Sequence, residues 1–303
     1  MRRSSLLILA AATIGLSPCA RAADPTPSAP SFQPPPDSTI PTGPFGDVVR
    51  QGEQIFRDPA TYAPKYVGNQ LSCSNCHFDA GRQPWVAPMW AAYVAFPEYR
   101  AKNGHVNTFA ERLQGCFRFS MNGKAPPLGD QVLVALETYS YFLAKGLPTG
   151  ENAPGRGYPK LPKPDVPADY ARGAQAFARH CAMCHGPQGL GISAGGKVLL
   201  PPLWGPHSFN WGAGMAEINT AAAFIRANMP YGAGGTLSVQ QAWDVATYVD
   251  SQIRPQDPRF IQSVAETRKR FHDTPFSMYG LAVNGTVLGD PATTPPAGTV
   301  PGN

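Results

Sequence analysis

Two pentapeptides of this chain each combine two thiols with an imidazole: CSNCH and CAMCH. The C-x-x-C-H pattern is the attachment signature of c-type haem, in which the thiols add to the haem vinyl groups and the histidine becomes the proximal iron ligand. Two disulfides or a zinc site are the alternative, but a zinc site needs further ligands. The sequence therefore predicts two covalently bound haem c groups. The attachment residues would be Cys73, Cys76, Cys181 and Cys184, and the proximal ligands His77 and His185.

The first 22 residues have the form of a secretory signal. Two arginines precede an apolar run from Leu6 to Leu16, and an A-x-A cleavage site ends at Ala22. The apolar run is too short to span a bilayer. Cleavage there would export the chain to the periplasm and remove Cys19. Five cysteines would remain, of which the two haem motifs use four, so Cys116 needs a separate explanation.

The composition says something about the fold and little about binding partners. The 303 residues include 34 prolines and 31 glycines, so much of the chain must be loop. Without the three arginines of the signal, 22 basic residues face 20 acidic ones. This nearly neutral balance points to no class of partner. The sequence shows no nucleic-acid patch, no phosphate loop and no transmembrane span.

The chain repeats one structural plan twice. Each unit has an amphipathic helix, a haem motif, a segment opening with Asn-Thr and a closing apolar helix that contains Thr-Tyr. This order resembles the small c-type cytochrome fold, in which the first and last helices cross and loops hold the haem. The predicted fold is mostly α, with two tandem small cytochrome c-type domains joined by a Pro/Gly-rich linker. The repeated segments are 46–58 and 170–180, 107–116 and 219–229, and 131–146 and 238–253.

The domain boundaries follow from this plan and from the Pro-rich stretches. The leader and the end of the chain are expected to be disordered, and residues 259–280 to pack back as helix and loop. The predicted divisions are a signal peptide at 1–22, a Pro-rich leader at 23–45, the first domain at 46–150, a linker at 151–168, the second domain at 169–255 and a C-terminal extension at 256–303.

The second unit offers a methionine as its distal iron ligand. Met229 stands directly before Pro230, and helices tend to stop before proline, which would leave the thioether in a rigid loop. Met215 is the main competitor for this role. Histidine and methionine together raise the reduction potential of a haem, which suits electron transfer. In the first unit the corresponding position is occupied by Cys116.

A helix start lies just before this cysteine. Thr108 and Glu111 form a T-x-x-E capping box, which places Arg112 and Cys116 four residues apart on one helix face. A cysteine thiolate on the iron would lower the reduction potential, opposite to the effect of methionine. A buried free thiol or an intermolecular disulfide would be the simpler fates of Cys116. The other candidate ligands nearby are Met121 and His105.

Several stretches are similar to one family, the dihaem thiosulfate dehydrogenases, which form tetrathionate in the periplasm. NTFAERLQGCFRFSMNG at 107–123 resembles the family in the first unit. PPLWGPHSFNWGAGM at 201–215 and NTAAAFIRANMP at 219–230 resemble it in the second. The similarity runs from about residue 46 to residue 255.

The resemblance implies an active-site haem 1 held by His77 and Cys116. It also implies an electron-transfer haem 2, held by His185 and Met229, that delivers electrons to an external cytochrome c acceptor. Some members have a lysine before the haem 2 methionine, where this chain has Asn228. A Lys/Met ligand exchange is therefore not expected here, and Lys197 is not expected to replace that lysine.

The segment around Cys116 is rich in positive charge. Joining two thiosulfate dianions into tetrathionate requires their repulsion to be offset, and arginine forks suit such oxyanions. Arg112 is the first candidate for contacting substrate, Arg100 and Lys102 follow, and Ser120 and Gln114 could donate hydrogen bonds. Cys116 could form a covalent thiosulfonate, or only set the potential of the haem. Residues 97–124 contain Arg100, Lys102, Arg112, Arg118 and Lys124 against Glu98 and Glu111.

Other functions fit parts of the same sequence. A dihaem electron carrier without a substrate of its own is the main rival. A haem-thiolate subunit of a sulfur-oxidising multienzyme system would need a partner cytochrome, whereas this chain has its second haem motif in place. A dihaem peroxidase would need an open or histidine-ligated site and a calcium site. The same site could also reduce tetrathionate, because relative potentials decide the direction.

Overall fold

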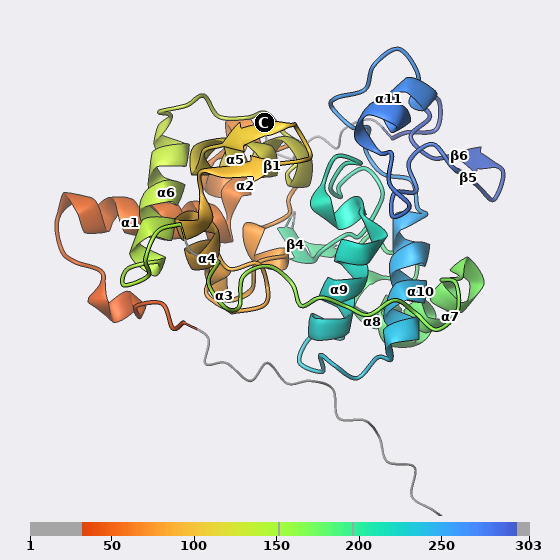
Figure 1. Ribbon diagram of the computed structural model, residues 1–303, viewed down its shortest axis with the longest axis horizontal. Coiled ribbons are helices and arrows are strands. Elements are labelled where there is room, and N and C mark those ends of the chain that lie inside the picture. The colour runs from red at the N-terminus through yellow and green to blue at the C-terminus, as the bar shows by residue number, and fades with distance from the viewer. Residues whose placement is uncertain (1–31, 151, 196, 296–303) are drawn as a thin grey trace, which may run out of the picture. The chain divides into compact units, whose positions relative to one another are not determined.

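The computed structural model describes residues 32–150, 152–195 and 197–295, and helices dominate them as predicted (Figure 1). The predicted signal peptide and the last residues of the extension lie outside the described residues. The α-helices of the first half are α1 (Pro44–Arg57), α2 (Pro59–Tyr62), α3 (Phe78–Gly81), α4 (Met89–Ala95), α5 (Phe109–Gly115) and α6 (Gln131–Leu143). Those of the second half are α7 (Tyr170–His180), α8 (Ala182–His185), α9 (Ile218–Asn228), α10 (Val239–Asp250) and α11 (Val264–Phe271).

Short elements complete the described chain. Three antiparallel hairpins pair β1 (Glu98–Arg100) with β2 (His105–Asn107), β3 (Ile192–Ala194) with β4 (Lys197–Leu200), and β5 (Ala282–Val283) with β6 (Thr286–Val287). The single-turn elements are the 3-10 turns η1 (Asp37–Thr39), η2 (Pro64–Tyr66), η3 (Cys73–Asn75) and η5 (Gly214–Ala216), and the π-helical turn η4 (Cys116–Ser120). Within the described residues, no helix is both long and apolar enough to cross a membrane.

Both halves are built on one helix crossing, with α1 packed on α6 and α7 packed on α10 (Figure 1). A Cβ at Gly52 would lie 2.1 Å from the carbonyl oxygen of Ala135 on α6. A Cβ at Gly173 would lie 2.1 Å from the carbonyl oxygen of Asp244 on α10. The helices approach this closely only because glycine carries no side chain. These glycines open the matched GEQIF and GAQAF sequences, so the repeat in the sequence marks the two crossing points.

Aromatic rings pack beside each crossing in the same way. The ring centroids of Phe56 and Tyr139 are 6.0 Å apart in the first half, and those of Phe177 and Tyr248 are 5.4 Å apart in the second. Each tyrosine is the one of the Thr-Tyr pair in its closing helix. The two halves therefore repeat one helix crossing with the same aromatic packing, as the predicted tandem fold requires.

The expectation of disorder was wrong for the described end of the Pro-rich leader. Arg82 donates from Nη1 to the carbonyl oxygen of Pro35 over 2.6 Å and forms an ion pair with Asp37. The Phe32 ring lies 5.3 Å from the Trp90 ring. A Pro-rich segment has little backbone freedom to lose, so a few such contacts are enough to hold it. Composition alone did not reveal these partners.

The described linker residues, 152–168, pack against both halves. The Tyr158 hydroxyl donates to the carbonyl oxygen of Cys76 over 3.1 Å, and Arg156 pairs with Glu98 at 2.6 Å. Farther along, the Trp243 indole nitrogen donates to the carbonyl oxygen of Pro162 over 2.8 Å. The described residues from 32 to 295 belong to one compact unit. The linker is therefore a structural part of both halves.

The C-terminal extension also packs back, as predicted for residues 259–280. The expected disorder was wrong for the residues that follow, because β5 and β6 form a hairpin beside α11 (Figure 1). The Gly280 amide donates to the carbonyl oxygen of Leu288 over 2.8 Å, and Leu288 and Tyr279 are buried in the main hydrophobic core. Buried apolar side chains thus anchor a segment whose composition suggested a tail.

Candidate active site

The first haem motif holds its histidine in the orientation that iron binding requires. His77 Nδ1 lies 2.6 Å from the carbonyl oxygen of Ala87, so Nδ1 keeps its proton and Nε2 is free to bind a metal. Burial lowers the pKa of His77 to about 4, and the positive charge of Arg112 acts in the same direction. The neutral imidazole, which is the form that binds iron, is therefore the stable one.

The second motif repeats this arrangement. His185 Nδ1 lies 2.8 Å from the carbonyl oxygen of Pro201, and burial lowers the pKa of His185. Cys181 packs against the aromatic cluster of α7 and α10, which includes Trp204. None of the five cysteines in the described part of the chain is disulfide-bonded. Each motif therefore offers two free thiols and one oriented imidazole, the donor set that fits haem c.

Cys116 lies at the C-terminal end of α5, where the predicted capping box is present. The Thr108 hydroxyl accepts from the Glu111 amide over 3.2 Å, and the Glu111 carboxylate accepts from the Thr108 amide over 2.7 Å. One turn later, Arg112 donates from Nη1 to the Sγ atom of Cys116 over 3.0 Å. The helix thus places Arg112 and Cys116 in contact, as their spacing predicts.

The chain leaves α-helical geometry at Cys116 itself. Residues Cys116–Ser120 form the π-helical turn η4, closed by a 3.0 Å hydrogen bond from the Met121 amide to the Cys116 carbonyl. The capping box predicted the start of the helix and gave no signal for this turn. Turns of this type are rare and are frequent at functional sites, because they change the direction of side chains.

The thiol of Cys116 lies near the first haem attachment thiols. Burial, with a smaller contribution from Cys116, raises the pKa of Cys76 to about 12. The pKa of Cys73 is raised by the same two causes, with Cys76 adding to them. The three sulfur atoms therefore belong to one site. Of the other candidate ligands, Met121 is buried in the main core, whereas His105 is exposed and lies 3.7 Å from Glu111.

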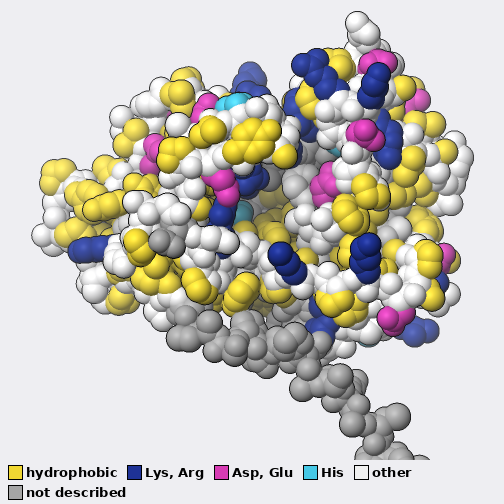
Figure 2. Space-filling view, viewed as in Figure 1, with side chains coloured by type: hydrophobic (Ala, Val, Ile, Leu, Met, Phe, Trp, Pro, Cys, Tyr) yellow, Lys and Arg dark blue, Asp and Glu magenta, His cyan; other side chains and the backbone are white. Residues whose placement is uncertain are grey.

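The predicted cations gather next to this site. Burial lowers the pKa of Arg100, and the charge of Arg112 lowers it further, so the two guanidinium groups lie close enough to interact. Glu98 is 3.5 Å from Arg100 and 2.6 Å from Arg156 of the linker. Arg156 was not predicted, because it joins the cluster only through the path of the linker. Figure 2 shows Lys and Arg side chains around a hollow in this face of the molecule.

Lys102 is held more firmly than a surface cation would be. Although the residue as a whole is exposed, its ammonium group donates to the carbonyl oxygen of Gly212 and lies 4.6 Å from the centre of the Phe119 ring. Burial of this group, together with the charges of Arg259 and Arg112, lowers the pKa of Lys102 to about 8. Lys102 therefore joins the cation cluster but also connects the two halves of the chain.

The predicted hydrogen-bond donors differ in how they are used. Gln114 donates its amide to the carbonyl oxygen of Pro126 over 2.7 Å, so this group has a structural partner. Ser120 is half-buried at the end of η4 and accepts through its carbonyl from Asn69 over 3.0 Å. Arg118 and Lys124, the remaining cations of the segment, are exposed.

The two methionines proposed for the second iron lie in different surroundings. Met215 packs against the main core, which belongs mostly to the first half. Met229 follows α9 and donates its amide to the carbonyl oxygen of Ile225 over 2.9 Å. Ile225 and Cys181 both pack against the same hydrophobic cluster of the second half, so Met229 follows a helix that contacts the cluster at the second attachment site. Asn228 is buried and donates to the carbonyl oxygen of Phe224 over 3.0 Å.

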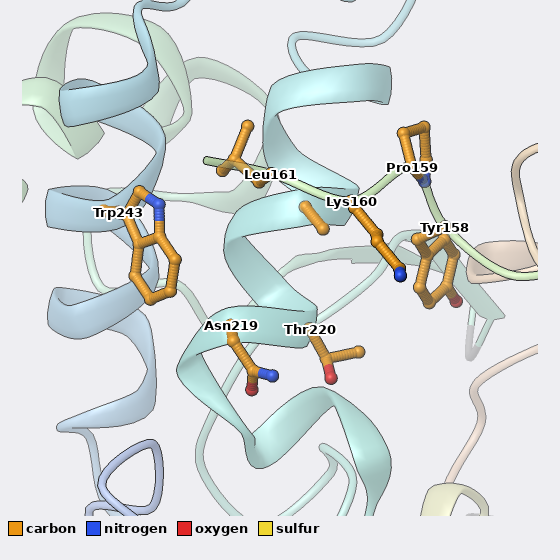
Figure 3. A pocket seen from close by; sticks show the side chains of 8 residues that line it. Tyr158, Pro159, Lys160, Leu161, Asn219, Thr220 and Trp243 are labelled. Carbon is orange, nitrogen blue, oxygen red and sulfur yellow. The ribbon is translucent and has the colours of Figure 1, made fainter. Parts of the chain in front are cut away.

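A separate cavity of about 410 Å³ lies between the linker, α9 and α10. Figure 3 shows Tyr158 at one side of it and Trp243 at the other, with Asn219 and Thr220 projecting from α9. Neither Cys116 nor the predicted cations are among the described residues that line it. Tyr158, which the sequence did not single out, connects this cavity to Cys76. The cavity is therefore adjacent to the first haem site but distinct from the cation cluster.

These features define a c-type cytochrome with two haem domains. Residues 52–149 match the family described as SoxA/TsdA, cytochrome c domain, and residues 170–252 match the family described as cytochrome c. The chain accordingly carries two covalently bound haem c groups, one for each matched domain. The thiols and imidazoles of its C-x-x-C-H motifs fit these groups.

Similarity to whole proteins identifies the family more closely. The chain is 59% identical over 259 residues to a thiosulfate dehydrogenase of Thiomonas intermedia, covering 86% of this chain and 82% of the relative. It is 52% identical to one of Stutzerimonas stutzeri, covering 85% of each. A solved structure of the thiosulfate dehydrogenase TsdBA of Marichromatium purpuratum matches with a TM-score of 0.82 and 50% identity. The match covers 86% of this chain and 57% of the solved one. The chain belongs to the thiosulfate dehydrogenase family.

Proposed function

We propose that this chain is exported to the periplasm and oxidises two thiosulfate ions to tetrathionate at its first haem site. His77 and Cys116 would hold the iron of that site, and His185 and Met229 the iron of the second. When bound, the two haem groups would supply the redox chemistry, with room for one of the two released electrons on each, and an external cytochrome would be the final acceptor. The observation that carries the proposal is the 3.0 Å bond from Arg112 to the sulfur of Cys116, beside Cys73 and Cys76.

Charge explains why the cations around Cys116 matter. Two dianions about 4 Å apart repel each other by roughly 4 kcal/mol even at the dielectric constant of water. A single cation at the same distance attracts each dianion by about 2 kcal/mol. Arg112 and Arg100 interact with each other electrostatically, so both lie where they could offset this repulsion. Arginine also offers a planar fork of donors that matches a sulfonate group.

Cys116 can take a covalent part in this reaction. Its thiolate and the sulfane sulfur of one thiosulfate form an S–S bond, which releases two electrons and leaves a cysteine-bound thiosulfonate. The sulfane sulfur of a second thiosulfate then attacks the sulfane sulfur of that adduct. The Cys116–sulfur bond breaks, the electron pair returns to Cys116 as thiolate, and tetrathionate leaves. In a simpler version Cys116 acts only as an iron ligand that lowers the potential.

A Cys116→Met variant separates these versions. It retains a sulfur ligand for iron but cannot form the covalent adduct. The ferric wild-type protein should show the electron paramagnetic resonance signal of a low-spin, thiolate-ligated haem, and mixing with thiosulfate should bleach the ferric spectrum. The variant should lose both properties. Full thiosulfate oxidation by Cys116→Met would exclude the covalent role.

The main alternative is an electron carrier that has no substrate of its own. It predicts that thiosulfate does not reduce either haem of the wild-type protein, whatever the ligands are. The clustering of Arg100, Arg112 and Lys102 beside one haem site favours the enzyme, because a carrier has no need to bind a small dianion there. Measuring both thiosulfate oxidation and tetrathionate reduction would establish the direction that the site supports.

A further inference from the structure

The C-terminal extension contains a buried ion-pair network centred on Asp257. The Asp257 carboxylate is fully buried and accepts from Arg259 at Nε over 3.0 Å and at Nη2 over 2.6 Å. It also lies 2.9 Å from Nε2 of His272, whose other nitrogen is 3.3 Å from the Ser277 hydroxyl. Burial opposes ionisation, but the hydrogen bonds from His272 and Arg259 hold the pKa of Asp257 well below its usual range. The carboxylate is therefore a charged and rigid anchor.

This network reaches the turn that carries Cys116. The Arg259 guanidinium lies 4.9 Å from the centre of the Phe119 ring, and the Lys102 ammonium lies 4.6 Å from the same centre. Phe119 belongs to the π-helical turn η4, three residues after Cys116. One aromatic ring thus contacts a cation from the C-terminal extension and a cation from the predicted substrate cluster.

The backbone of the second half is shaped to admit this contact. A Cβ at Gly212 would lie 2.4 Å from Cδ1 of Phe119 and 3.2 Å from Oδ1 of Asp257, so glycine lets both groups approach. The neighbouring Asn210 donates from its side-chain amide to the Arg118 carbonyl over 2.9 Å. Its backbone amide donates to the Phe119 carbonyl over 3.2 Å. Residues more than eighty positions farther along the chain therefore contact both the Phe119 side chain and the backbone of η4.

We propose that Arg259 is a positioning residue for thiosulfate oxidation. Asp257, which His272 contacts from its other side, holds Arg259 against the Phe119 ring. This contact keeps the turn η4 in place, and with it the Cys116 sulfur and the Lys102 ammonium that packs on the same ring. Arg259 touches neither substrate nor iron in this account. The inference rests on the proposed function, because it assigns the C-terminal extension a part in the same site.

The test is an Arg259→Gln variant of the full-length protein with both haems attached. Loss of the brace should lower kcat/KM for thiosulfate on the order of tenfold to a hundredfold, the range in which small displacements of catalytic groups act. The electron paramagnetic resonance signal of the thiolate-ligated haem should broaden or split, because the Cys116 turn becomes heterogeneous. The signal of the second haem should not change.

Arg270→Gln is the matched control. Arg270 lies on α11 in the same extension, is exposed, and contacts only the neighbouring Phe271 ring among the interactions described for it. This variant removes the same charge and should leave the kinetics and both haem signals unchanged. If Arg259→Gln behaves like the control, or disturbs both haems equally, the positioning role is wrong and the network only stabilises the fold.

A second variant keeps the proposal testable if Arg259→Gln does not fold. Phe119→Leu removes the braced ring and leaves the Asp257–Arg259–His272 network intact. It should broaden the thiolate haem signal in the same way, and an unchanged signal would overturn the proposal.

The wild-type protein distinguishes failure of this proposal from failure of the proposed function. If thiosulfate fails to reduce wild-type haem, the proposed function fails, while the resonance signal still reports whether Arg259 positions the turn.

Discussion

Removing the guanidinium beside Cys116 gives the most direct test of the site. In Arg112→Gln, a residue of similar helix propensity replaces arginine, so α5 and its capping box should persist. The change deletes the 3.0 Å hydrogen bond to the Cys116 sulfur. Hydrogen bonds to charged groups are worth about 1.5–3 kcal/mol, which corresponds to roughly a tenfold to 150-fold change in an equilibrium or rate.

The lost charge adds to this effect. A cation about 4 Å from a dianion is worth roughly 2 kcal/mol in a medium like water, so thiosulfate should also bind more weakly. We expect kcat/KM for thiosulfate to fall by at least tenfold, with KM rising as well as kcat falling.

Stopped-flow reduction of the ferric protein by thiosulfate measures the first step directly. The matched control is Arg270→Gln, which removes one exposed charge far along the chain and should reduce at the wild-type rate. The reasoning is refuted if Arg112→Gln reduces as fast as the control at all thiosulfate concentrations. A loss shared equally by both variants would instead indicate a general effect of net charge.

Three further predictions concern the fold. Gly52→Ala or Gly173→Ala should each lower the free energy of unfolding by about 1–3 kcal/mol, because a methyl group at either helix crossing would overpack it. Denaturant titration measures this loss. Gly214→Ala is the control, because the space around Gly214 is open, and it should leave the free energy of unfolding unchanged. Burial lowers the pKa of His272. As the pH falls below about 6.5, His272 therefore takes up a proton in the unfolded chain before it does so in the folded one, and the free energy of unfolding should decrease. His272→Gln should flatten that part of the profile of stability against pH. Arg82→Gln should release the end of the leader and increase its proteolysis, and unchanged cleavage would argue against this anchor.

The sequence determined the features that depend on neighbouring residues. The two C-x-x-C-H motifs indicated two haem c groups, and the capping box at Thr108 placed the start of α5. The spacing of Arg112 and Cys116 predicted their contact, because residues four apart on a helix share a face. Each of these inferences needs only helix geometry or the chemistry of one short motif.

Tertiary structure decided the contacts between distant segments. Lys102 meets Gly212 across 110 residues, and Arg259 reaches the Phe119 ring from the C-terminal extension. Tyr158 joins the linker to Cys76, a contact that the Pro/Gly-rich composition of the linker did not reveal. Nothing in the local sequence specifies such partners, because they depend on how separate apolar surfaces pack. The π-helical turn that follows α5 was likewise not indicated by any local pattern.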